Sequence, residues 1–426
     1  MKTPFAPPSH LNSLRRFDVA VIGGGPAGSS AALALARSGC RVLIVERADE
    51  NSIRAGETLP PRVRLELERL GLWREFRGGG HLASTGIRSA WGDSPPLEND
   101  SLFDPYGNGW HVDRGRFDAM IRDAASAQGA ELSVGVRFHR AERSRLGWRL
   151  HVIGEQGPFT VEARFVVDAT GRPTAFARDR GVSRLRVDRL VGVVGYFEHK
   201  PTTREAERVA LIEAVEDGWW YSAPIPDGRL VVTLMTDSDL IADPGQPSVS
   251  AWLGKLGHTS LTRSRVDAYA PPPILGIFPS GSGALVSATG DNWLAVGDAA
   301  VAVDPISGQG IIRSLRDGPK AAHAVLEALD GQCESIDAYR YEHTKDFVEY
   351  LTMRCAYYRQ EQRWSGSPFW SRRHEPPKLI PRNARPRPIG IDNVFAGRLP
   401  AHEARESGSR SNEPPRISSG FFPVVR

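Results

Sequence analysis

The spacing of apolar residues predicts alternating strands and helices at the start of the chain. Residues 18–22 and 41–45 are short apolar runs of the kind that form buried strands, and residues 29–37 between them favour a helix. Gly39 stands where such a helix commonly ends. A further amphipathic helix is expected over residues 63–70. This order of elements predicts a β-α-β unit at the N-terminus.

Beyond this opening the pattern is mixed, then largely β, then mixed again. Further strands are expected at residues 87–91, 109–112, 131–138, 148–153, 159–167 and 293–296. Residues 190–234 keep the β pattern, with a hairpin turned at 226–228, where Pro-Asp-Gly favours a turn. Helices are expected at 116–127 and 311–329. The chain is therefore predicted to be an α/β protein with a β-rich middle.

A glycine-rich turn joins the first strand to the first helix and matches the pattern G-x-G-x-x-G. Gly23 allows a tight turn, Gly25 lets the backbone approach a pyrophosphate, and Gly28 lets the helix pack closely on the strand. The N–H groups at the start of the helix attract phosphate. Glu46, at the end of the second strand, is placed to accept hydrogen bonds from a ribose hydroxyl. Because all these elements agree, we expect an adenine dinucleotide here, and not glycines that merely connect a strand to a helix.

The composition is that of a soluble globular enzyme. The chain has 426 residues, of which 40% are hydrophobic and 24% are charged. It has no apolar window of about 20 residues, and its N-terminus lacks the apolar segment of a secretory signal. Its cysteines, Cys40, Cys333 and Cys355, are too few and too scattered for a disulfide framework or a zinc site. These features favour a reducing, cytoplasmic setting without a membrane span.

The positive charge is concentrated at the C-terminus. The net charge is +4 at pH 7, and residues 366–426 contain 11 Lys or Arg, 5 Asp or Glu and 10 Pro. The rest of the chain is therefore slightly acidic, and we expect no nucleic-acid partner. Segments rich in Pro, Arg and Ser usually remain disordered, so residues 376–426 are predicted to form an unstructured tail. The alternative is a tail that binds a partner.

Three separated motifs resemble the FAD-dependent monooxygenase superfamily with the para-hydroxybenzoate-hydroxylase-like fold. They are GGGPAG with Glu46, DATGR at 168–172, and WLAVGDAAVAVDPISGQGI at 293–311. Within this superfamily, G-E-T at 56–58, DRGRFD at 113–118 and the Trp-rich hairpin resemble the branch of tryptophan halogenases and geranylgeranyl reductases.

Three longer segments narrow the resemblance further. GETLPP at 56–61, GWWYSAP at 218–224 and residues 363–370 are similar to flavoproteins that oxidise a protein tryptophan. Those enzymes act during quinone-cofactor (cysteine tryptophylquinone) biogenesis, in the maturation of amine dehydrogenases and of lysine or glycine oxidases.

The resemblance implies a two-part architecture. It implies a Rossmann-like FAD-binding domain of the glutathione-reductase type, with an inserted, mostly antiparallel β-sheet substrate domain and C-terminal helices. The expected FAD-binding domain is discontinuous and comprises residues 14–85, 112–185 and 271–330. The expected substrate domain comprises residues 86–111 and 186–270, and residues 331–370 form the C-terminal helical segment.

The same resemblance points to residues around a non-covalent FAD. Asp298, after a strand, would accept a hydrogen bond from a ribityl hydroxyl; its alternative role is to cap the next turn. Residues 307–310 open a long helix whose N–H groups would face flavin N1 and C2=O. The full set of expected cofactor residues is Gly23, Gly25, Pro26, Ala27, Gly28, Glu46, Arg47, Glu57, Thr58, Arg114, Gly171, Gly297, Asp298, Pro305, Gly308 and Gly310.

Several of these side chains have an alternative role that involves no cofactor. Arg114 would lie beside the cofactor or be an exposed surface arginine. Arg54, Glu57 and Thr58 belong to a loop that would face the flavin, and Glu57 would otherwise be an ordinary loop carboxylate.

The substrate residues are expected on the Trp-rich strand. Because residues on a strand alternate between faces, one or two of Trp219, Trp220 and Tyr221 should line a substrate cavity while the others pack the sheet. The alternative is that all three only pack the core. None of the 11 histidines stands in a metal-binding array, so no metal is expected. His81, His111 and His199 are expected to be packing or surface residues.

The expected reaction follows from the cofactor. The chain has a single dinucleotide motif, so electrons must come from NAD(P)H that docks transiently or from a separate flavin reductase. The resemblance implies a monooxygenase that uses O2 and a flavin C4a-hydroperoxide to hydroxylate an indole-type aromatic, either a small molecule or a tryptophan within a polypeptide. The alternatives are a halogenase, a reductase of the geranylgeranyl reductase type, and a non-enzymatic FAD-binding scaffold or redox sensor.

One absence argues against halogenation. Halogenases of this branch capture hypohalous acid on a lysine, which would fall near Ala83, but the chain has no lysine between Lys2 and Lys200. Their W-x-W-x-I-P box is also altered, because residues 219–226 read WWYSAPIP. The sequence therefore predicts an oxygenating enzyme.

Overall fold

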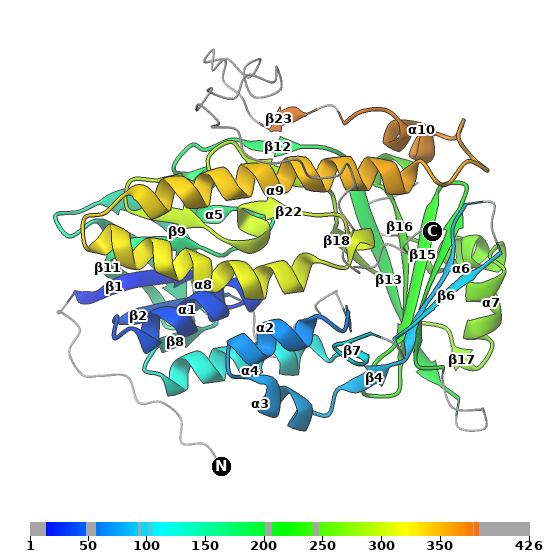
Figure 1. Ribbon diagram of the computed structural model, residues 1–426, viewed down its shortest axis with the longest axis horizontal. Coiled ribbons are helices and arrows are strands. Elements are labelled where there is room, and N and C mark those ends of the chain that lie inside the picture. Colours follow the sequence, from blue (N-terminus) through cyan, green and yellow to red (C-terminus); the bar gives the residue numbers. More distant parts are fainter. Residues whose placement is uncertain are drawn as a thin grey trace, which may run out of the picture.

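The chain folds around two large β-sheets that lie at opposite ends of the molecule in Figure 1, with eight strands in each. The computed structural model describes residues 14–47, 57–92, 95–101, 104–200, 207–241, 247–377 and 379–382.

The first sheet has a parallel centre built on the predicted β-α-β unit. Its strand order is β20-β21-β11-β1-β2-β8, with β10 and β9 added antiparallel beside β11. Val19, Ala20 and Val21 of β1 are fully buried, as expected for a parallel strand covered on both faces. The strands are β1 (Arg15–Ile22), β2 (Val42–Glu46), β8 (Glu131–Val134), β9 (Arg137–Arg143), β10 (Trp148–Gly154), β11 (Gly157–Asp168), β20 (Thr289–Gly290) and β21 (Trp293–Ala295).

Helices cover both faces of this sheet. One face carries α1 (Pro26–Arg37), α4 (Arg114–Ala127) and α8 (Gly310–Leu329). α1 and α8 pack so closely that a Cβ atom on Gly318 would lie 2.0 Å from the Ser30 Oγ, so only glycine fits at this position. The other face carries α5 (Ala175–Asp179) and α9 (Glu334–Tyr358), and Figure 1 shows α9 running from this sheet to the second one.

The second sheet is mostly antiparallel, with the strand order β17-β13-β16-β15-β14-β5-β6 and with β18 beside β13. The predicted hairpin is confirmed, because the Ile225 N–H donates to the Arg229 carbonyl at 2.9 Å across the turn. The helices α6 (Val249–Gly257) and α7 (Leu261–Val266) flank this sheet. The strands are β5 (Gly86–Ala90), β6 (Leu97–Asp100), β13 (Leu190–His199), β14 (Val209–Val215), β15 (Gly218–Pro224), β16 (Leu230–Asp237), β17 (Tyr269–Ala270) and β18 (Gly276–Pro279).

Two small sheets and several short helical elements complete the described fold. One small sheet has the order β3-β7-β4 and the other β22-β19-β12-β23. Their strands are β3 (Thr58–Leu59), β4 (Leu82–Ser84), β7 (Gly109–His111), β12 (Arg184–Arg186), β19 (Gly283–Leu285), β22 (Val301–Ala302) and β23 (Ile380–Arg382). The remaining short helical elements include α2 (Val63–Arg69), α3 (Trp73–Gly78), α10 (Pro368–His374) and η4 (Pro305–Ser307). The predicted α/β fold class is confirmed.

Several boundaries differ from the prediction for physical reasons. The strand predicted at 131–138 is two strands, β8 and β9, because Gly135 has a φ of +73° and breaks the run. β18 lies in a range predicted for the FAD-binding domain, yet it pairs with β13 of the second sheet. The prediction of a tail unstructured from residue 376 is wrong for β23, which pairs antiparallel with β12. Residues 383–426 lie outside the described residues.

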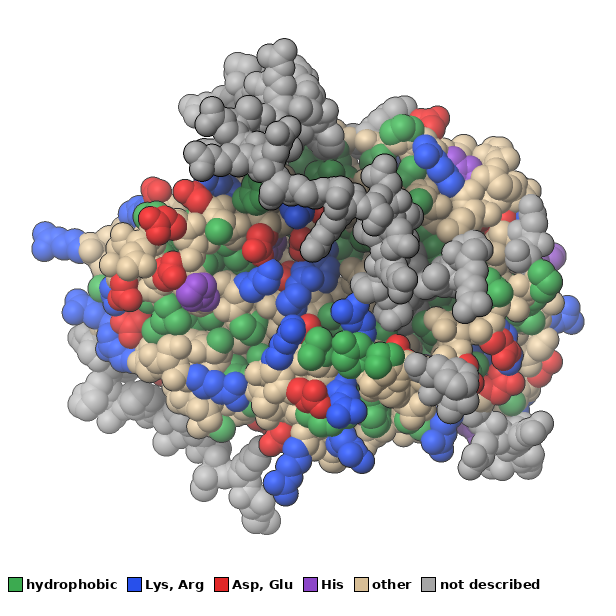
Figure 2. All heavy atoms as spheres, in the orientation of Figure 1, with side chains coloured by type: hydrophobic (Ala, Val, Ile, Leu, Met, Phe, Trp, Pro, Cys, Tyr) green, Lys and Arg blue, Asp and Glu red, His purple; other side chains and the backbone are tan. Residues whose placement is uncertain are grey.

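The surface in Figure 2 carries basic, acidic and apolar side chains interspersed on the face shown. Among the described helices, none combines the length and the apolar character needed to span a bilayer.

Candidate active site

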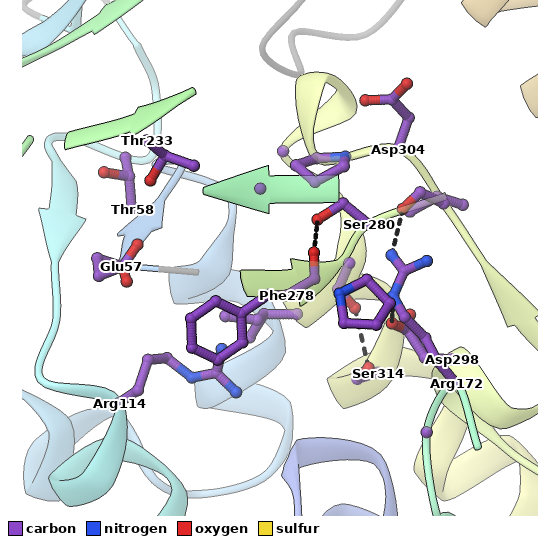
Figure 3. Close-up of a pocket in the computed structure, with 18 of the residues that line it drawn as sticks. Glu57, Thr58, Arg114, Arg172, Thr233, Phe278, Ser280, Asp298, Asp304 and Ser314 are labelled. Atoms are coloured by element: carbon purple, nitrogen blue, oxygen red, sulfur yellow. Dashed lines mark hydrogen bonds and ion pairs between the residues drawn. The ribbon is translucent and has the colours of Figure 1, made fainter. Parts of the chain in front are cut away.

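A cavity of about 430 Å³ is lined by elements from both large sheets. One side is made by the glycine-rich turn before α1, the end of β11 and the segment that leads into α8. The opposite side is made by the face of the second sheet that carries Trp219 and Tyr221. Figure 3 shows side chains from both sides pointing into this space.

The glycine-rich turn has the geometry that its sequence predicts. Gly23 has a φ of +110°, and a Cβ atom there would lie 2.2 Å from the Ala169 carbonyl oxygen. A Cβ atom on Gly28 would lie 1.9 Å from the Gly23 carbonyl oxygen, so α1 can pack here only without a side chain. A Cβ atom on Gly25 would meet no protein atom within 4 Å. Gly25, Pro26 and Ala27 therefore line open space at the start of α1.

Glu46 holds this turn from beneath. Its Oε2 accepts the backbone N–H of Gly24 at 2.5 Å, while Arg122 donates to the Gly24 carbonyl at 3.1 Å. Glu46 is buried next to the turn and does not line the cavity. Arg47 is exposed after β2 and does not line this cavity, so its role toward FAD stays a prediction.

A second helix N-terminus faces the same cavity. Asp304 caps η4, because its Oδ1 accepts the Ile306 N–H at 3.0 Å. Gly308 follows with a φ of +60°, and α8 then begins at Gly310 with no acidic residue in its first turn. Pro305, Gly308 and Gly310 all line the cavity, and a Cβ atom on Gly310 would meet only open space.

Gly297 and Asp298 serve different purposes. Gly297 has a φ of +61°, and a Cβ atom there would lie 2.6 Å from the Ala27 Cβ, so the glycine permits close packing on α1. Asp298 lines the cavity, and its Oδ2 lies 3.3 Å from the Arg172 Nε. Arg172 also donates to the Val303 carbonyl at 2.9 Å. Arg172 also lines the cavity but was not predicted as a site residue, although it closes the DATGR motif beside Gly171.

Arg114 is an inward-facing residue. Its side chain is only 14% exposed, and its NH2 lies 3.3 Å from the Asp118 Oδ2. The alternative of an exposed surface arginine is therefore wrong. Glu57 is also buried at the cavity wall, where it accepts a hydrogen bond from the Tyr196 hydroxyl at 3.3 Å. Burial, together with the Glu57 carboxylate, raises the pKa of Tyr196. Arg54 lies outside the described residues.

Thr58 joins the cofactor side of the cavity to its sheet side. Its Oγ1 lies 2.6 Å from the Tyr221 hydroxyl and 2.8 Å from the His111 Nδ1. Burial lowers the pKa of His111 to about 3, so the imidazole is neutral at physiological pH. The prediction of a packing histidine fits His81 too, whose ring lies 4.7 Å from that of Phe76.

The Trp-rich strand alternates as predicted. Trp219 and Tyr221 line the cavity. Trp220 faces the opposite side of the sheet, where its ring lies 5.0 Å from that of Trp252, so it is not a cavity residue. Met235 pairs with Trp219 and Thr233 pairs with Tyr221 across β15 and β16, and both line the cavity. These two were missed, although counting back from the hairpin turn would have placed them opposite the aromatic residues.

The residues present fit a bound FAD. Two helix N-termini without acidic first turns face one cavity, and Gly25 and Gly310 leave room for a ligand at both. A pyrophosphate would lie at α1, and the start of α8 would stabilise negative charge on the flavin ring. The fold and the cavity therefore define a flavoprotein that binds FAD.

The comparisons with known proteins identify the family. Residues 16–354 match the FAD binding domain family, and the chain belongs to it. The FAD-dependent oxidoreductase LodB of Marinomonas mediterranea is 30% identical over 365 residues, which cover 85% of this chain and 98% of that protein. The chain is thus an FAD-dependent oxidoreductase, and the superfamily resemblance is confirmed.

Two solved structures are similar over most of the chain. The myxobacterial chondrochloren halogenase CndH has a TM-score of 0.76 at 25% identity, covering 84% of this chain and 86% of its own. The peptidyl tryptophan dihydroxylase QhpG, described as essential for tryptophylquinone cofactor biogenesis, has a TM-score of 0.69 at 25% identity, covering 84% and 79%.

Proposed function

We propose that the chain is a monooxygenase that hydroxylates the indole of a tryptophan carried within a polypeptide. The observation that carries the proposal is the distribution of charge around the cavity. All charged side chains among its described lining residues come from elements outside the second sheet: Glu57, Arg114, Arg172, Asp298 and Asp304. Of these, Glu57 borders that sheet through its hydrogen bond from Tyr196. The wall on the second sheet is uncharged and is made by Gly192, Val194, Ile212, Trp219, Tyr221, Thr233, Met235 and Phe278.

This wall suits a neutral aromatic group. Trp219 and Tyr221 bring aromatic rings that can pack against an indole, and Met235 adds a polarisable side chain. A free amino acid would bring an ammonium and a carboxylate group, and burying unpaired charges is costly. The charged lining residues already have protein partners, such as Asp118 for Arg114 and Tyr196 for Glu57. A residue within a polypeptide carries neither charge, so its side chain can enter without that cost.

The chain's own contribution is binding, orientation and dryness. FAD, when bound and reduced by NAD(P)H or by a separate reductase, supplies the activation of O2. The first turns of α1 and α8 bind the cofactor, while the apolar sheet wall holds the indole and excludes water. The likeness to QhpG, whose description names peptidyl tryptophan, supports this assignment.

Halogenation is the second candidate, and the likeness to CndH favours it. Against it, no lysine stands among the described residues that line the cavity, so a halogenating species would have no amine to capture it. We therefore rank halogenation below direct hydroxylation.

The test compares three substrates that carry the same indole: L-tryptophan, N-acetyl-tryptophanamide and a tryptophan peptide. Each is incubated with reduced enzyme under isotopically labelled O2 in excess chloride and bromide. We expect labelled oxygen in the peptide product, and kcat/KM for the neutral amide about tenfold or more above that for the free amino acid. A halogenated product, or turnover without O2, would refute the proposed reaction. A preference for free tryptophan would refute the polypeptide substrate.

A further inference from the structure

One stripe of α9 reaches from the cofactor side of the cavity to its substrate side. Tyr350, Arg354 and Tyr358 are spaced by four residues, so they share one helix face, and all three are buried. The family match ends at residue 354, so Tyr358 lies just beyond it.

All three side chains meet at Asp304, which lines the cavity and caps the turn before α8. The Tyr350 hydroxyl accepts the Asp304 N–H at 2.7 Å. The Arg354 Nε and the Tyr358 hydroxyl donate to the Asp304 Oδ2 at 3.3 Å and 2.8 Å. Because the Asp304 Oδ1 holds the Ile306 N–H, this cluster fixes the segment that carries Pro305 and Gly308.

Tyr358 has a second partner on the other side of the cavity. The Trp219 Nε1 donates to the Tyr358 hydroxyl at 3.1 Å. A phenol has one hydrogen to donate, which goes to Asp304, and its lone pair takes the indole N–H. The hydroxyl thus connects the wall expected to hold the substrate with the turn expected to lie under the flavin.

We propose that Tyr358 is a positioning residue that holds Trp219 and the turn 304–308 in one fixed arrangement. Tyr358 is not among the described residues that line the cavity, so it acts through its two partners. The part of this proposal that concerns the substrate rests on the proposed function, and the part that concerns the flavin does not.

Packing alone is the competing explanation for Tyr358. Its ring lies 5.6 Å from that of Trp91 and 5.9 Å from that of Trp370, and the Arg354 guanidinium lies 4.8 Å from its centre. These contacts belong to the ring and survive in phenylalanine. Tyr358→Phe therefore separates the hydroxyl from the packing.

The matched control is Tyr357→Phe. Tyr357 is the adjacent buried tyrosine, it also packs on Trp91, and its hydroxyl interacts with Ser89 on β5. The same atom is removed from the same helix turn, but neither Trp219 nor Asp304 loses a partner.

The experiment reads each end of the connection separately. The first readout is the set of ten indole N–H signals of the ¹⁵N-tryptophan-labelled protein, in which Trp219 is assigned by Trp219→Phe. The second is the absorbance spectrum and midpoint potential of bound FAD. The third is KM and kcat with the tryptophan peptide.

We expect Tyr358→Phe to shift the Trp219 signal, to change the flavin spectrum and potential, and to raise KM about tenfold, as the loss of one buried hydrogen bond predicts. Tyr357→Phe should leave all three unchanged. A Tyr358→Phe protein that only melts earlier, with the indole signal and flavin spectrum of the wild type, would overturn the proposal. If the wild type fails to turn over the peptide, the proposed function fails, but the first two readouts still decide the role of Tyr358.

Discussion

Glu46→Ala removes the acceptor that holds the glycine-rich turn in place. The Glu46 carboxylate accepts the Gly24 N–H at 2.5 Å, and the residue is 7% exposed, so water replaces this bond poorly. A hydrogen bond to a charged group contributes about 1.5–3 kcal/mol. If the turn must be held for α1 to receive the FAD pyrophosphate, the FAD Kd should rise roughly 10- to 150-fold. Glu46→Gln keeps an acceptor oxygen without the charge, so its FAD Kd should lie between that of the wild type and that of Glu46→Ala.

The assay is a titration of the apoprotein with FAD, followed by the quenching of flavin fluorescence. The control is Glu131→Ala on the neighbouring strand β8, because Glu131 pairs with Arg15 at the surface, where such pairs contribute little. A Glu46→Ala protein whose Kd stays within about twofold of the wild type would refute the reasoning.

Three further predictions follow from the described contacts. Gly25→Val should abolish FAD binding in the same titration yet leave the melting temperature of the apoprotein nearly unchanged, because a Cβ atom there meets no protein atom within 4 Å. Burial lowers the pKa of His111 from 6.5 to about 3, so between these pH values only the unfolded state binds this proton, and the free energy of unfolding should fall as pH drops below 6.5. His111→Gln should reduce that fall, as measured by urea unfolding at a series of pH values. A pH dependence equal to that of the wild type would contradict this prediction. Truncation after Arg382 should preserve the melting temperature, whereas truncation after Pro376 should lower it because it removes β23 from its partner β12. Equal melting temperatures for the two truncated proteins would contradict this pairing.

The local features of the site could be predicted from sequence because they depend on neighbours in the chain. The turn at Gly23 and the start of α1 follow from a short motif whose glycines each have a steric reason. The split between Trp219 and Trp220 follows from the two-residue period of a strand. In each case the sequence pattern that predicts the feature spans only a few residues, although the contact that it serves can be distant, as that between Gly23 and Ala169 is.

The features that the sequence did not predict depend on partners far away in the chain. Arg172 reaches Asp298 and Val303 across more than 120 residues, and its motif carries no mark of this pairing. β18 joins the second sheet because β13 leaves an edge open beside it, which is a property of the assembled sheet. β23 consists of a few residues in a proline-rich stretch, and only its partner β12 makes it a strand.

The same scaffold supports hydroxylation and halogenation, so the choice between them must come from side chains. CndH and QhpG have the same 25% identity to this chain and both share its fold, so overall likeness cannot separate their reactions. On the proposal above, the two chemistries would differ in whether an amine stands at the substrate end of the cavity. Here the described wall on the second sheet is built from aromatic, aliphatic, sulfur and hydroxyl side chains, and every charged residue that lines the cavity comes from an element outside that sheet. An oxygen atom can pass directly to an indole held against such a wall, whereas a hypohalous acid would find no group to hold it.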